Sequence, residues 1–170
     1  MKGLIILHPL HHPYFVKFIV YFNKNQDFFE CHEVLEDYWK EQPNFDKSHP
    51  LTAYILLATG LYHWRRGNFI GAEKTLAKAY KKMSYLQHVT PLFTDGIDFP
   101  LVYKNLVKSM HAVKEKQPFQ SFPIEITSAE LQTLYQRTAE NLTLLPPNSK
   151  AIIDKHLLRP KADLKSKKKR

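Results

Sequence analysis

The feature that most constrains this sequence is a segment, residues 51–64, that is apolar on nearly every side when it is drawn as a helix. The segment reads LTAYILLATGLYHW and contains almost no polar side chains. Its most apolar part is too short to cross a bilayer. A helix without a polar face has to be covered by other elements all round. The sequence therefore predicts that this helix is the central, buried element of a bundle.

The residues on either side of this segment predict where the central helix begins and ends. Ser48 is the expected N-cap, with Pro50 in the first turn. Gly67 is suited to the left-handed position that ends a helix, and Asn68 is suited to cap the next one. The following helix, residues 69–87, has a clean apolar stripe. So short a link forces the two helices into an antiparallel hairpin.

Further helices are predicted before and after the hairpin, and none of the sequence shows the alternation of a strand. They cover residues 14–22, 27–41, 100–116, 127–142 and 149–158. Asp27 with Glu30 and Thr127 with Glu130 have the spacing of a capping box. The expected fold is all-α: a single compact bundle of about five main helices, with a buried central helix and a helical hairpin.

Charge and composition suggest how the chain is divided. We expect an N-terminal extension (1–13), a helical core (14–126), a C-terminal helical extension (127–159) and a disordered basic tail (160–170). Residues 161–170 hold six Lys and Arg and one Asp, which is most of the net charge of +9. Cys31 is the only cysteine, which excludes an internal disulfide and a multi-cysteine zinc site. No convincing targeting segment is found, and we expect a cytoplasmic protein.

The segment 27–41 carries the side chains with the clearest chemistry. On a helix, Phe28, Cys31 and Leu35 share the apolar face. Glu33 is expected to point away from that face, and His32 and Glu36 to lie at its edge. His32-Glu33-x-x-Glu36 is one histidine short of the zinc-protease helix motif, in which two histidines bind the metal and the glutamate is the base.

A metal site built on this motif needs a further ligand. His32 and Glu36 supply two, and His63 on the central helix is the best third candidate. Arg66 would either reach solvent or pair with Glu33 or Glu36. The alternative is that these residues only hydrogen-bond one another and a neighbouring helix. We expect His32, Glu33, Glu36 and His63 to form one buried or half-buried cluster that binds a ligand rather than turning it over.

Several runs of residues together resemble the domain of unknown function 309 family of bacterial and archaeal proteins. They are Phe22-Asn23, the run FFECHEVLEDYW at 28–39, the run GLYHWRRGN at 60–68, and Gly71-Ala72. The similarity covers about residues 14–87 and implies an all-α bundle with no established biochemical activity. The family often has a small residue at the position of Cys31, so no thiol role is implied. The hairpin also looks like one tetratricopeptide unit, but no second copy follows.

Three functions from different classes follow from these observations. The preferred hypothesis is a binding or interaction module with a polar pocket between the helices at 27–41 and 51–66. The candidate pocket residues are His32, Glu33, Glu36, Trp39, His63, Arg66 and Asn68. The second hypothesis is a metal-dependent hydrolase with His32, Glu36 and His63 as ligands of a divalent metal and Glu33 as general base. The third is a nucleic-acid-associated protein that uses residues 161–170. The sequence names no cofactor, protein partner or small-molecule partner, and fixes no oligomeric state.

Overall fold

The computed structural model describes residues 6–158. The predicted basic tail at 160–170 lies outside the described residues. The α-helices are α1 (Pro13–Val20), α2 (Phe28–Lys40), α3 (Leu51–Arg65), α4 (Phe69–Val89), α5 (Phe99–Lys114), α6 (Ala129–Asn141), α7 (Lys150–Ile153) and α8 (Lys155–Leu158). Short 3-10 helices lie at Pro9–His11 and Pro91–Phe93, and a π-helical turn at Tyr21–Asn25 extends α1.

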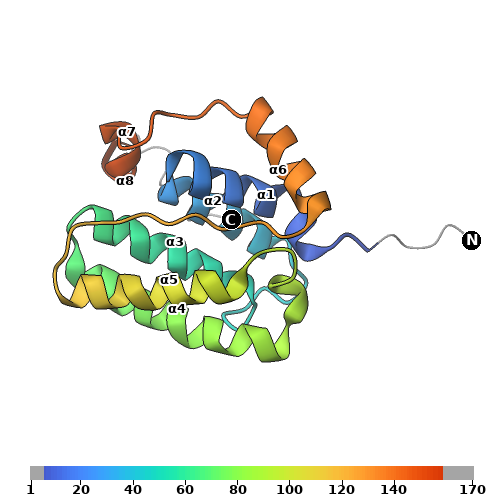
Figure 1. The fold of residues 1–170 in the computed structure, drawn as a ribbon, viewed down its shortest axis with the longest axis horizontal. Helices are drawn as coiled ribbons and strands as arrows, with labels where there is room; N and C mark the ends of the chain where they lie inside the picture. Colours follow the sequence, from blue (N-terminus) through green and yellow to red (C-terminus); the bar gives the residue numbers. More distant parts are fainter. Residues whose placement is uncertain (1–5, 159–170) are drawn as a thin grey trace, which may run out of the picture.

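The helices pack side by side, with α3 in the middle. α3 lies against α2 on one side and against α4 on the other, α5 covers α4, and α1 and α6 continue beyond α2 (Figure 1). Tyr54, Leu57 and Leu61 of α3 are fully buried, as the apolar pattern of this helix predicts. Between residues 6 and 158 no strand forms, and one isolated antiparallel bridge joins Ile97 to Ile126. The predicted all-α fold is confirmed.

An extended segment, residues 115–128, joins α5 to α6 and runs along the length of the bundle (Figure 1). Asn23 holds this segment with two hydrogen bonds to the backbone of Ile124. Phe119 packs its ring edge-on against Phe28 and against Trp64. The segment is therefore part of the core, although it contains no helix.

Most of the predicted helix ends are confirmed. The Asp27 side chain accepts a hydrogen bond from the backbone N–H of Glu30, so it caps α2. Gly67 has a φ of 75°, the left-handed conformation that glycine adopts without strain. Asn68 accepts from the N–H of Gly71 and caps α4. These contacts make the tight turn between α3 and α4.

Two predicted caps are wrong by a few residues. Ser48 does not cap α3, because its N–H and hydroxyl both bond to Asp46, and His49 Nδ1 accepts from the N–H of Leu51 instead. At α6 the cap is Ser128 rather than Thr127. The N–H of Thr127 donates to Gly96, so Thr127 still belongs to the extended segment.

None of the helices between residues 6 and 158 is both long enough and apolar enough to span a bilayer.

Candidate functional site

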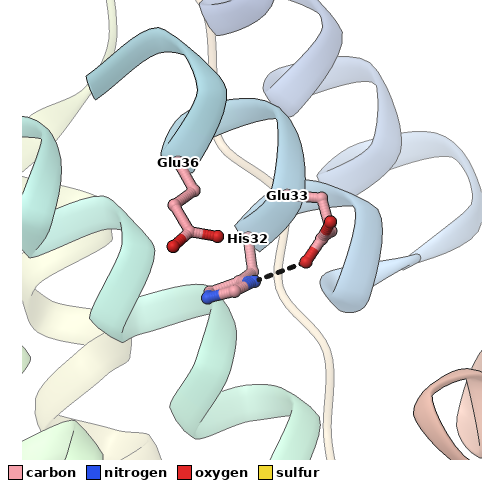
Figure 2. A group of neighbouring side chains, drawn as sticks. All are labelled: His32, Glu33 and Glu36. Atoms are coloured by element: carbon pink, nitrogen blue, oxygen red, sulfur yellow. Dashed lines mark ion pairs between the residues drawn. The ribbon is translucent and has the colours of Figure 1, made fainter. Parts of the chain in front are cut away.

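His32, Glu33 and Glu36 lie together on one turn of α2. One ligand atom from each side chain can be chosen so that all three atoms lie within 4.8 Å of one another. The Nδ1 atom of His32 is 3.4 Å from a carboxylate oxygen of Glu33. In Figure 2 the carboxylates of Glu33 and Glu36 lie on either side of the imidazole. We call these three residues the α2 triad.

Glu33 is largely buried, although the sequence predicts that it points away from the apolar face of its helix. The residue is 8% exposed, so this side of the helix is covered as well. Because α2 packs against both α1 and α3, more of its surface is covered than a single apolar stripe. Burial of a carboxylate beside an imidazole favours an interaction that compensates its charge.

The charge near the triad is mostly negative. α2 carries four acidic side chains, Glu30, Glu33, Glu36 and Asp37, and a single lysine, Lys40. Lys40 pairs with Glu36 at 3.3 Å, four residues away on the same helix. Both partners of this ion pair are partly exposed, so the pair is weak and exchangeable. Among residues 6–158, Lys40 is the ion-pair partner of Glu36, so a cation at the triad would compete with this lysine.

Arg66 does not pair with the triad. The sequence offered it solvent, Glu33 or Glu36, but its Nε atom lies 3.3 Å from a carboxylate oxygen of Asp154. Asp154 follows α7 and is 88 residues further along the chain. Nothing in the local sequence indicates this pairing, so it was missed. Because Arg66 pairs with Asp154, it does not compete with a cation for the carboxylates of Glu33 and Glu36.

His63 has partners of its own and is not a member of the triad group. Its Nδ1 atom is 3.2 Å from Nδ2 of Asn68. Because Oδ1 of Asn68 accepts from Gly71, the amide NH₂ group faces the histidine, and Nδ1 is the acceptor. Burial, with Arg66 and His156 nearby, lowers the pKa of His63 below its ordinary value. The neutral ring then carries its proton on Nε2.

The C-terminal residues Asp154, Lys155 and His156 contact α2 and α3 through three consecutive polar side chains. We call them the clasp. Besides the Asp154 pair with Arg66, Lys155 lies 2.7 Å from Asp27 and 3.0 Å from Glu30. Nδ1 of His156 is 2.5 Å from the hydroxyl of Tyr62, which also accepts the backbone N–H of His156 at 3.3 Å.

Aromatic rings connect the triad to the clasp. The ring of Phe29 is 6.3 Å from that of His32 and 5.7 Å from that of Tyr62, measured between centroids. The ring of Tyr62 in turn is 5.6 Å from that of His156. The triad and the clasp are therefore separated by two rings, one from α2 and one from α3.

The remaining candidates have structural contacts. Trp39 donates its indole N–H to the carbonyl of Asp46, and its ring lies tilted against that of Phe45, so it fixes the loop before α3. Asn68 is the α4 cap. Cys31 is fully buried, and burial raises the pKa of its thiol well above the ordinary value, which keeps it protonated and unreactive.

Comparison with known proteins finds a family similarity over part of the N-terminal half of the chain. The family described as a domain of unknown function (DUF309) matches residues 15–75. The uncharacterized protein YpuF of Bacillus subtilis (strain 168) is 28% identical over 159 residues, which cover 88% of each chain. No solved structure matches the chain. The matched segment contains α2, α3 and the whole triad. Residues 15–75 of this protein are therefore similar to the domain of unknown function 309 family, and the chain as a whole is similar to YpuF.

Proposed function

We propose that this protein is a binding module whose α2 triad binds one divalent transition-metal ion. The observation that carries the proposal is the placement of an imidazole and two carboxylates within 4.8 Å of one another on one helical turn. Imidazole and carboxylate together suit ions such as Zn²⁺ and Mn²⁺.

The spacing of the triad supports this proposal. Ligand atoms about 2.1 Å from a tetrahedral metal lie about 3.4 Å apart. The separation of 3.4 Å between His32 and Glu33 already has this value. The third side chain, Glu36, is partly exposed on the same helix turn, and one of its carboxylate oxygens lies within 4.8 Å of the other two ligand atoms.

Three ligands from one helix leave coordination positions open. A structural zinc site is closed by four protein ligands, whereas three leave room for water or for a group from another molecule. We propose that the ion links this protein to a ligand that supplies the missing donor. This fits a binding module better than a site that only stabilises the fold.

The hydrolase hypothesis assigned Glu33 as the base and His63 as the third ligand. Glu33 instead has the geometry of a ligand, and His63 bonds to Asn68. With Glu33 on the metal, the triad has no carboxylate left to take a proton from water. These contacts support binding as the function.

The test is calorimetric titration of the untagged protein with Zn²⁺ and with Mn²⁺. We expect one ion per chain for at least one of the two, and a loss of affinity of tenfold or more in the variants His32→Ala and Glu36→Gln. His88→Ala and Glu73→Gln are matched controls on the exposed face of α4 and should bind as the unchanged protein does. His63→Ala should also retain binding.

Two results would contradict the proposal. One is the absence of saturable binding of either ion. The other is binding that survives both triad substitutions, which would place the ion elsewhere, for example near the adjacent rings of His8 and His11. Thermal unfolding of each variant shows whether the fold is retained.

A further inference from the structure

A groove of about 800 Å³ lies between the first turn of α3 and the second half of α4. Its volume is in the range of sites for small molecules. None of the triad or clasp residues lines it. It is therefore separate from the proposed metal site.

The α4 wall of the groove changes from basic to apolar along the helix. Lys78, Lys81 and Lys82 line its first part, and Tyr85, Leu86 and Val89 line the rest. These positions follow the three- and four-residue spacing of one helix face and span about 16 Å. Tyr85 is 68% exposed and Val89 54%, so both offer apolar surface to a ligand.

The α3 side and the end of the groove add apolar surface and a free hydroxyl. Pro50 and Ala53 line the α3 side. Thr90 lines the end, and its hydroxyl oxygen is buried without a hydrogen-bond partner among residues 6–158. A buried hydroxyl of this kind is costly unless a ligand or water bonds to it.

Two of the three lysines that line the groove have no acidic partner among residues 6–158. The described lining of the groove includes three lysines and no Asp or Glu. Lys82 donates to the carbonyl of Lys47, and Asp46 lies near it. Lys78 and Lys81 form no ion pair with any residue that the structure describes. The C-terminal residues 161–170 are themselves strongly basic, so they do not complement this charge.

From this polarity we infer that the groove binds a small anionic amphiphile, a molecule with a carboxylate or similar headgroup on an apolar chain. The headgroup lies against Lys78 and Lys81, and the chain runs along Tyr85 and Val89. Charge fixes the direction of the ligand, and burial of its chain supplies most of the affinity.

The probe is dodecanoate, titrated below its critical micelle concentration and followed by calorimetry. We expect saturable binding at one site, weakened about tenfold by the double variant Lys78→Gln/Lys81→Gln. Val89→Asp should weaken it as well. Lys74→Gln removes an exposed lysine of the same helix that does not line the groove, and should leave binding unchanged.

Two further probes complete the test. Dodecyltrimethylammonium, which has the opposite charge, should bind at least tenfold more weakly than dodecanoate. Vesicles of mixed phosphatidylglycerol and phosphatidylcholine should not retain the protein. Equal binding of the two amphiphiles, retention on vesicles without binding of free dodecanoate, or no effect of the double variant would each overturn the inference. None of these results depends on the α2 triad.

Discussion

At Gly60 the backbone of α3 lies against Leu76 of α4, with no space for a side chain. A Cβ atom built at Gly60 would be 2.7 Å from Cγ of Leu76 and 3.3 Å from its backbone nitrogen. The Leu76 side chain is fully buried, so it has little room to move away. The close approach of the two helices of the hairpin thus depends on a single missing methyl group.

We expect Gly60→Ala to lower the free energy of unfolding by about 1–3 kcal/mol, since added volume in a packed core forces neighbours out of place. Urea unfolding measures the change. Thr59→Ala, at the adjacent position of α3, is the control and should have a smaller effect. An unchanged or raised stability of Gly60→Ala would show that α3 and α4 do not pack as closely as described here.

Four histidines make stability depend on pH. Burial lowers the pKa values of His12, His49, His63 and His156 below the ordinary value of 6.5. The unfolded chain therefore binds more protons than the folded chain between these lowered values and 6.5. The free energy of unfolding should fall as the pH drops through 6.5, and the fall should stop below the folded pKa values.

Urea unfolding at pH 7.5, 6.5 and 5.5 tests this dependence. We expect the highest stability at the highest of the three pH values, and a shallower dependence in the variant His156→Ala. A stability that rises as the pH falls would contradict this account. It would mean that the folded chain binds more protons than the unfolded chain, so that folding raises the pKa values of these histidines.

At the scale of single residues, part of the candidate site can be predicted from the sequence. His32 and Glu36 are four residues apart on a helix, so their proximity follows from helical geometry alone. The burial of Glu33 does not, because it depends on how much of α2 is covered by α1 and α3. The partner of His63 is Asn68, only five residues away, but a histidine–amide contact across a helix end has no sequence signature that distinguishes it from a metal ligand.

The elements themselves were predictable where the signals are local. Asp27, Gly67 and Asn68 act within one turn of their own positions, and their predicted roles are correct. Ser48 failed as a cap because Asp46 competes for its N–H and hydroxyl. α3 begins at Leu51, so Ser48 lies before the capping position.

The clasp belongs to a short C-terminal element that is held by polar contacts. Lys155 places its ammonium between Asp27, whose side chain is 2% exposed, and Glu30. Lys155→Ala would leave the Asp27 carboxylate buried without its cation. We expect a loss of about 1–3 kcal/mol in the free energy of unfolding, reduced from the value for a fully buried pair because the lysine is partly exposed.

Two further variants separate this effect from a general loss of charge. Lys150→Ala removes an exposed lysine of α7 that has no described ion pair, and it should change stability little. Asp27→Asn keeps an acceptor for the α2 cap, so adding it to Lys155→Ala should recover part of the loss. If Lys155→Ala and Lys150→Ala have equal effects in urea unfolding, the clasp contributes nothing specific.

For the whole molecule, the central position of α3 followed from the sequence because a helix without a polar face has to be covered. The contacts of residues 154–156 with α2 and α3 did not follow, since they join positions 88 to 128 residues apart. No periodic pattern indicates which surface a short polar segment will meet. The contact between Asn23 and the extended segment at 115–128 is also not indicated by any periodic pattern, since Asn23 and Ile124 are 101 residues apart.

Charge is divided between the two sides of the bundle. α4 and α5 together carry seven lysines and one glutamate, while α2 carries four acids and one lysine. α3 lies between them (Figure 1). The two proposed sites thus have opposite preferences: a cation at α2 and an anion in the groove of α4.

The most direct test of the α2 triad follows the imidazole nitrogens of His32 and His63 by NMR while Zn²⁺ is added, with assignments from His32→Ala and His63→Ala. A nitrogen that binds a metal shifts strongly, whereas a nitrogen that bonds to an amide does not. We expect the His32 signals to shift at one equivalent of Zn²⁺ and the His63 signals to stay in place. A shift of His63 together with His32, or of neither, would contradict a metal site formed by His32, Glu33 and Glu36.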